Sequence, residues 1–230
     1  MHRNLDIHLG CERRVIFDFV NVLQKECSLN QALIKDKRKP NLSILAASQT
    51  KDKTILTEDR VGEMLDELRK HFEYIVCDSP AGIESGARHA MYFSDEAIIC
   101  TNPELSSCRD SDKMIGFIAS NSLRAKNNLD PVRQTLLVTR YDPKRASLEE
   151  SLSLEDIHEL LGLPLVGVIP ESKSVLTSTN LGNPVISVAG DKAGEAYRDV
   201  VKRFLGAEVP FRFTTYEQPS FFQRMFGGGE

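Results

Sequence analysis

The residues best suited to chemistry in this sequence follow a short apolar run, Tyr74–Cys77. Asp78 ends that run, and Ser79-Pro80-Ala81-Gly82 then predicts a turn. A carboxylate at the carboxyl end of a buried parallel strand lies at the crevice where open α/β sheets bind ligands. Asp78 would there hold Mg²⁺ beside a nucleotide phosphate, and Gly82, which has no Cβ, would let a backbone N–H approach that phosphate. The spacing fits equally well a plain turn that Asp78 only orders.

The apolar pattern predicts the elements that would position these residues. Tyr74–Cys77 is expected to be a strand buried on both faces, because it is short, apolar and rich in β-branched residues. Further strands are predicted at Leu42–Ala46, Glu96–Thr101, Thr135–Thr139 and Leu165–Ile169. Helices are predicted at Arg14–Gln24, Leu29–Ile34, Glu58–Lys70, Ala87–Phe93, from Ser106 or Ser107 to Ser120, and at Leu154–Leu161, Ser174–Leu181 and Ala193–Leu205, whereas Met1–Gly10 shows no clear pattern.

Strands and helices alternate along the chain, which is typical of parallel βαβ units. The predicted fold class is therefore α/β: one doubly wound, mostly parallel sheet with helices on both faces. Four predicted strands are followed by polar or turn-forming residues, at Asp78, Thr101-Asn102-Pro103, Arg140 and Pro170-Glu171. These strand ends meet at one edge of a parallel sheet, which strengthens the prediction of a ligand site there.

Composition narrows the possible partners. The 230 residues are 41% hydrophobic and 27% charged, with a net charge of −4, so the overall field does not favour nucleic acid. The five cysteines are scattered without a Cys-x-x-Cys pair, and reduced thiols, buried at Cys77 and Cys100, are expected in a cytoplasmic protein. The five histidines show no metal-ligand spacing. No apolar run approaches the roughly 20 residues that span a bilayer, and no signal peptide is predicted.

Several stretches resemble the MinD family of deviant Walker-A (ParA/MinD) ATPases. They are Arg3-Asn4-Leu5-Asp6, Gly10-Cys11-Glu12-Arg13-Arg14-Val15, Asp18-Phe19-Val20-Asn21-Val22, Asn30-Gln31-Ala32-Leu33-Ile34, Cys77-Asp78-Ser79-Pro80-Ala81-Gly82-Ile83-Glu84, Thr101-Asn102-Pro103-Glu104, Arg109-Asp110-Ser111-Asp112 and Val166-Gly167-Val168-Ile169-Pro170-Glu171, together with the Phe-rich end. The resemblance implies a P-loop NTPase-like fold and a role in division-site selection. It implies an ATP-dependent homodimer on the cytoplasmic face of the inner membrane, which recruits MinC to block polar septation and is regulated by MinE.

The resemblance also implies roles for particular residues. On the nucleotide side, Asp78 matches the Mg²⁺-side carboxylate, Gly82 the γ-phosphate sensor and Glu104 a residue that reaches the ribose across the dimer. The neighbourhood of the adenine is matched by Arg140, Pro170 and Glu171. Asn4, Asp110 and Asp112 fall in regions that the family uses to meet its partners, although charges on an exposed helix are more often a solvated face.

One departure from the family pattern concerns the phosphates. The sequence contains no Gly-x-x-x-x-Gly-Lys-[Ser/Thr], and Gly190-Asp191-Lys192-Ala193-Gly194 lacks the required spacing. The resemblance places the P-loop, the first strand and the second strand ahead of residue 1, so an amino-terminally truncated chain is expected. Such a polypeptide is predicted neither to hydrolyse ATP nor to fold stably alone, and to expose a groove of apolar side chains.

Three readings of function stay open on the sequence. The first is a membrane-cycling ATPase of division-site placement, and the second is a non-catalytic interaction fragment that keeps the partner and membrane surfaces. The third is a ParA-type partitioning ATPase or a flagellar-number relative, which the net charge and the Phe-rich tail suit poorly.

The end of the chain reads either as a disordered tail or as a short membrane anchor. As a helix it would place four apolar side chains on one side: Phe221, Phe222, Met225 and Phe226. Gln223 and Arg224 would lie on the opposite side. Burying each Phe at a bilayer is worth about 1.5–3 kcal/mol before ordering costs. The resemblance favours an anchor for anionic inner-membrane lipid, although Arg224 is its single base. The expected divisions are an incomplete ATPase domain over 1–210, a flexible linker over 211–218 and an amphipathic membrane-targeting tail over 219–230.

Overall fold

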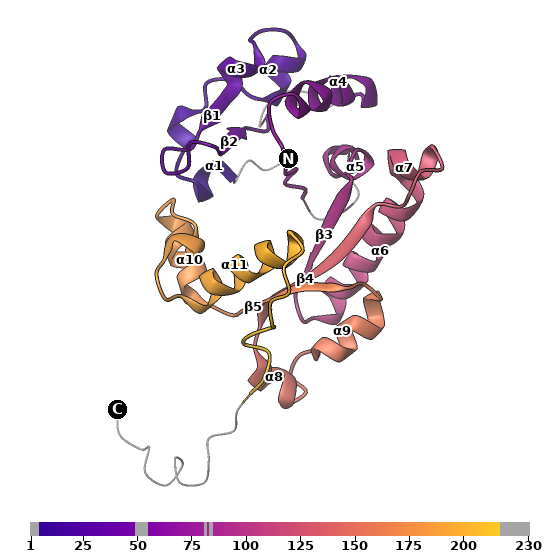
Figure 1. Ribbon diagram of the computed structural model, residues 1–230, viewed down its shortest axis with the longest axis vertical. Coiled ribbons are helices and arrows are strands. Elements are labelled where there is room, and N and C mark those ends of the chain that lie inside the picture. Colours follow the sequence, from indigo (N-terminus) through magenta and orange to yellow (C-terminus); the bar gives the residue numbers. More distant parts are fainter. Residues whose placement is uncertain (1–4, 49–54, 81, 83–84, 217–230) are drawn as a thin grey trace.

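The computed structural model describes residues 5–48, 55–80, 82 and 85–216 (Figure 1). Its central feature is a parallel sheet of β3 (Glu96–Thr101), β4 (Arg133–Tyr141) and β5 (Leu165–Pro170), in the order β3-β4-β5. Ile99 lies opposite Leu136 in the register of β3 and β4. All three strands run in the same direction, so their carboxyl ends share one edge.

Helices cover the two faces of this sheet unequally. On one face, α6 (Leu105–Asn121) and α9 (Leu154–Leu161) pack on a core that includes Ile99, Leu136 and Ile157. On the other face, α11 (Lys192–Phe204) packs on β5 and β4 through Val200, Val166 and Leu137. A Cβ on Gly167 of β5 would lie 2.2 Å from Cγ2 of Val200, so the close approach of α11 requires glycine there.

The amino-terminal elements form a separate layer above the sheet in Figure 1. An antiparallel pair, β1 (Leu33–Lys35) and β2 (Ser43–Leu45), lies beside α4 (Glu58–Arg69), whose apolar stripe is buried. Arg38 ties this layer to the remainder, because its guanidinium donates to Leu9 O and to Asn183 Oδ1. The remaining short helices are α1 (Leu5–His8), a 3-10 turn (Glu12–Arg14), α2 (Phe19–Leu23), α3 (Leu29–Ala32), α5 (Ser85–Tyr92), α7 (Leu123–Lys126), α8 (Pro143–Ser147), α10 (Lys173–Asn180) and a 3-10 turn (Val185–Ser187).

Most predicted elements are present, and the α/β class is confirmed. The bounds of β3 and α9 match the prediction, and α4 begins after its predicted cap, Thr57. Other bounds were wrong. The predicted helix over Leu29–Ile34 ends at Ala32 and gives way to β1, and the predicted helix over Arg14–Gln24 shrinks to the five residues of α2. Met1–Gly10 contains α1 within its described part.

The cap of α6 also differs from the prediction. Glu104 occupies the position before the first turn, in place of Ser106 or Ser107, and makes no side-chain cap hydrogen bond. The Ser107 hydroxyl accepts instead from the backbone N–H of Asn102 at 3.2 Å, which fixes the loop after β3.

The central sequence prediction, a buried strand at Tyr74–Cys77, was wrong. The segment has no strand assignment, Tyr74 is exposed and Val76 is 89% exposed. Its residue types favour a strand, but a strand needs a hydrogen-bonded neighbour, and within the described residues β3 is the outermost strand of the sheet. The predicted burial of Cys77 and Cys100 was wrong for the same reason, since both are exposed.

The face of β3 that points toward α11 is open. Ile98 and Cys100 alternate with the buried Ile99 and Thr101, and both are exposed, since the buried cluster beneath α11 draws its strand residues from β4 and β5. The predicted exposure of apolar side chains beside this strand is therefore present. Among the described helices, none combines the length and apolar character that crossing a membrane requires.

Candidate functional site

Three residues from the predicted nucleotide side meet at the carboxyl edge of the sheet. Glu104 follows β3, Arg140 lies near the end of β4, and Glu171 follows β5. All three line a small cavity of about 40 Å³, together with Asn102, Pro103, Arg145, Glu150 and Ser151. The edge predicted from the strand ends therefore exists, with residues of all three strands around one hollow.

Hydrogen bonds hold this edge in place. Arg140 has a positive φ of 57°, and its Nε donates to Glu171 Oε2 at 3.0 Å. The backbone N–H of Glu171 donates to Tyr141 O at 3.1 Å, which joins the ends of β4 and β5. The hydroxyl of Thr139 lies 2.9 Å from Asn102 Oδ1, which joins β4 to the loop after β3. Pro170 is the last residue of β5 and opposes Tyr141 in the register.

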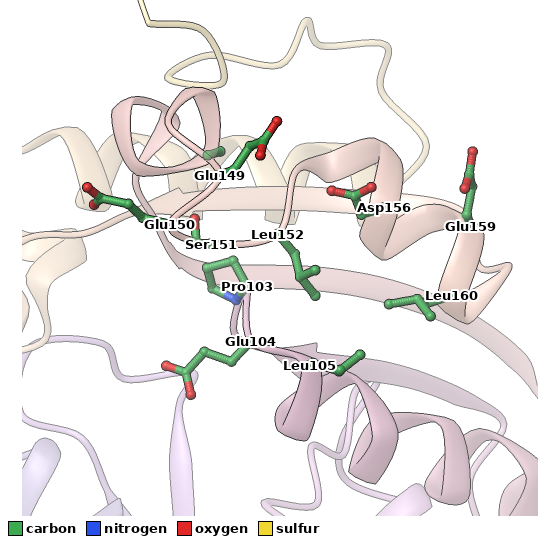
Figure 2. Close-up of a pocket in the computed structure, with 11 residues that line it drawn as sticks. Pro103, Glu104, Leu105, Glu149, Glu150, Ser151, Leu152, Asp156, Glu159 and Leu160 are labelled. Carbon is green, nitrogen blue, oxygen red and sulfur yellow. The ribbon is translucent and has the colours of Figure 1, made fainter.

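A larger pocket of about 830 Å³ adjoins this cavity (Figure 2). It lies between the start of α6 and α9, and Leu152 and Leu160 point into it in Figure 2. Five of its side chains are carboxylates: Glu104, Glu149, Glu150, Asp156 and Glu159. The remaining lining is Pro103, Leu105, Ala146, Ser151, Leu152 and Leu160. Apolar side chains among five carboxylates favour a basic or amphipathic partner over an anionic one.

One of these carboxylates already has a structural role. Asp156 accepts from the hydroxyl of Ser153 at 2.7 Å and from its backbone N–H at 2.9 Å, which caps α9. These hydrogen bonds hold the pKa of Asp156 below its usual value, so it stays charged into mildly acidic solution.

Asp78 and Gly82 do not join this group. Asp78 is exposed after the unpaired segment. Although Cys100 is exposed overall, partial desolvation raises the pKa of its thiol, and the charge of Asp78 raises it further, which places Asp78 near β3. Gly82 has a φ of 90°, a left-handed conformation that favours glycine, and open space where a Cβ would stand. In the described part of the chain, no hydrogen bond or ion pair joins Asp78 or Gly82 to Arg140 or Glu171.

The predicted partner-binding residues lie partly outside the description. Asp110 and Asp112 are exposed on α6, and Asp110 pairs with Lys113 at 2.9 Å. Asn4 and the predicted membrane residues Phe221, Phe222, Arg224, Met225 and Phe226 lie outside the described residues. Of the predicted linker, residues 211–216 are described.

The residues present do not fit a complete Mg²⁺–ATP site. These residues include no Gly-x-x-x-x-Gly-Lys-[Ser/Thr] that could cradle the phosphates. The carboxylate of Glu104 stands at the amino-terminal end of α6, where its charge disfavours a phosphate. Within the described residues, no three acidic, histidine or cysteine side chains are grouped to hold a metal ion. We therefore derive no hydrolytic step from these 230 residues.

Sequence reasoning missed the acidic pocket. Glu149 and Glu150 form an adjacent pair after α8, and Asp156, Glu159 and Leu160 lie on one side of α9. Spacings of three and four on a helix are the signal that could have grouped the latter residues. Their meeting with Glu104 depends on tertiary packing.

Comparison with known proteins defines the class of this fold. A MinD from Pyrococcus horikoshii, solved with Mg-ADP, superimposes with a TM-score of 0.72 at 24% identity, covering 91% of this chain and 83% of that one. The Aquifex aeolicus MinC:MinD complex gives a TM-score of 0.79 at 32% identity, covering 91% of this chain and 81% of that one. The fold is thus that of the MinD/ParA P-loop ATPases.

Sequence comparison identifies the family. The chain is 58% identical over 227 residues to the septum site-determining protein MinD of Escherichia coli K12, a match that covers 98% of this chain and 84% of that protein. No family model matches the sequence. The chain belongs to the MinD family of septum site-determining cell-division proteins.

Proposed function

We propose that this chain acts in division-site selection by presenting α6 and the adjoining acidic pocket to MinC while its tail holds it at the inner membrane. The observation that carries the proposal is the 32% identity to the MinD of the Aquifex aeolicus MinC:MinD complex over 91% of the chain. The exposure of Asp110 and Asp112 on α6 supports it, because both carboxylates are accessible to a partner.

The remaining parts of the function follow from the family. MinE regulates the protein, and the form that binds anionic lipid on the cytoplasmic face is a homodimer that depends on ATP and Mg²⁺, for which these 230 residues supply the strand-end side of the site but no phosphate-binding loop. Dimerisation matters because one short tail binds weakly and two linked tails bind by avidity. Asp78, Gly82, Glu104, Arg140, Pro170 and Glu171 are the residues of this chain on the nucleotide side.

The MinC interaction is testable by charge reversal on α6. Asp110→Lys and Asp112→Lys are expected to weaken MinC binding at least tenfold in calorimetry or pull-down, because repulsion replaces attraction at an interface. Both side chains are exposed, so the free energy of unfolding should change by less than about 0.5 kcal/mol.

Asp130→Lys is the matched control, since Asp130 is an exposed acid on the loop after α7. It should bind MinC as the parent chain does. Unchanged MinC binding by both α6 variants would refute the proposal that α6 contacts MinC. Loss of binding by a variant that is unfolded would not support it.

A second candidate function is a non-catalytic interaction protein, favoured by one observation. These 230 residues contain no Gly-x-x-x-x-Gly-Lys-[Ser/Thr]. In this alternative the chain keeps the MinC and membrane surfaces and turns over no ATP. Measured ATP turnover separates the two candidates.

A further inference from the structure

The chain after α11 folds back as a strap, residues 206–213, instead of leaving the molecule. Arg203 holds its first half, donating to Val209 O at 2.8 Å and to Pro210 O at 2.7 Å. The same guanidinium donates to Val166 O on β5 at 3.1 Å and lies 4.1 Å from the ring centre of Phe211. One arginine therefore fastens the strap to the helix and to the sheet together.

A second arginine fixes the far half of the strap. Arg212 pairs with the buried carboxylate of Asp199 at 2.6 Å and with Glu195 at 2.8 Å. Phe213 packs against the core beneath α11. The end of the strap is therefore held against α11 by these ion pairs. Figure 1 shows the strap running from the end of α11 past β5.

Exposed apolar and basic side chains occur both on α11 and on the strap, and we name them together the α11–strap patch. Its members are Val201, Lys202, Leu205, Phe211 and Arg212. Val201 and Leu205 are one helical turn apart and both are exposed, Leu205 to 60%. Lys202 and Arg212 are neighbours because both reach Asp199, at 3.7 and 2.6 Å. Exposed apolar groups among bases are typical of surfaces that meet an anionic interface.

Charge is distributed so that this face differs from the opposite one. Residues 192–213 carry five Lys or Arg and three Asp or Glu, whereas the whole chain has a net charge of −4. The acid-lined pocket belongs to the face of the sheet covered by α6 and α9, and α11 covers the other face. An anionic bilayer would attract the face covered by α11 and repel the face that carries the acid-lined pocket.

We propose that the α11–strap patch rests on an anionic phospholipid bilayer and orients the protein with its acidic pocket turned away from the lipid. This inference rests on the proposed membrane role of the tail. Five residues separate Phe213 from Pro219, where the predicted tail begins, and the connection spans at most about 20 Å. A tail bound to lipid therefore keeps the patch within reach of the same surface. The patch also supplies bases that the tail, with Arg224 alone, lacks.

The absence of tryptophan from the sequence allows a direct test. Leu205→Trp places a single reporter in the patch, and Leu129→Trp is its matched control, because Leu129 is 57% exposed on the loop after α7. The 230-residue chain is mixed with vesicles of phosphatidylcholine and phosphatidylglycerol. The emission of the Leu205→Trp variant should shift to shorter wavelength and be quenched by brominated lipid, and the control should do neither.

A charge variant gives an independent measurement. Lys202→Glu should weaken sedimentation with the anionic vesicles by at least about fivefold, roughly the effect of one base near an anionic surface. Lys37→Glu, at an exposed lysine on the turn between β1 and β2, should leave it unchanged. Circular dichroism below the melting temperature verifies that each variant is folded.

The possible outcomes distinguish lipid binding by the α11–strap patch from membrane anchoring by the tail. If the parent chain sediments with these vesicles, Phe222→Glu abolishes sedimentation, and neither Leu205→Trp emission nor Lys202→Glu binding changes, then the patch is refuted and the tail anchor stands. A parent chain that fails to sediment at all refutes both.

Discussion

At the scale of single residues, Asp36 shows how a carboxylate can stabilise without any catalytic role. It is buried at the turn between β1 and β2 and accepts from the side chain of Arg38 and from the backbone N–H groups of Arg38 and Lys39. The hydrogen bond from the Arg38 side chain is the largest cause that lowers the pKa of Asp36. Since Arg38 also donates to Leu9 O and to Asn183 Oδ1, this carboxylate helps to hold the amino-terminal layer on the loop after α10.

The lowered pKa predicts how stability depends on pH. A group with a lowered folded-state pKa stabilises the protein above its unfolded pKa, about 3.9 for Asp, and loses that effect as pH falls through the folded value. Asp36→Asn should therefore lower the urea midpoint at pH 7, and the difference from the parent chain should shrink below about pH 4. A difference that stays constant down to pH 3 would contradict the assignment.

At the scale of elements, the seating of α11 on the sheet depends on Gly167. Its missing Cβ leaves room for Val200, which a Cβ would approach to 2.2 Å, and for Leu137, which it would approach to 3.0 Å. Gly167→Ala is expected to destabilise the fold by about 1–3 kcal/mol, because overpacking a close contact forces the helix outward. Thermal or urea unfolding measures the change.

Gly116→Ala on α6 is the control for that substitution. Nothing lies within 4 Å of a Cβ built on Gly116, and alanine is the better helix former, so this variant should be stabilised by up to about 1 kcal/mol. If both glycine variants changed stability equally, packing of α11 would not be the cause.

Elements differed in how far the sequence could predict them. The helix α9 was predictable, because Ser153 and Asp156 form its capping box and Leu161 precedes the left-handed Gly162. Tyr74–Cys77 was not, because residue type indicates a strand and only a neighbouring strand can pair with it. The acidic pocket was missed for a similar reason: Glu104, Glu150 and Glu159 come from three separate segments.

At the scale of the whole molecule, some of the residues predicted for the nucleotide side lie together in the structure and others lie apart. Arg140 and Glu171 are joined by a hydrogen bond at the strand ends, and Glu104 lines the same cavity. Asp78 stands apart after an unpaired segment, beside the open face of β3. The strand ends predicted this edge well, because each polar residue follows its own strand. They did not predict that Asp78 stands apart from the other three residues, because that depends on how strands pair.

The last prediction concerns ATP turnover by the polypeptide of residues 1–230. Phosphoryl transfer needs a backbone cradle and cationic groups at the phosphates, and these residues include no Gly-x-x-x-x-Gly-Lys-[Ser/Thr] to supply them. Phosphate release should therefore equal that of a buffer blank, under conditions in which the cell division ATPase MinD of Pyrococcus furiosus serves as the positive control. The melt should also be broad, because Ile98 and Cys100 leave one side of β3 uncovered. Turnover above the blank that Asp78→Asn abolishes, with a sharp cooperative melt, would show that these residues assemble a working site after all.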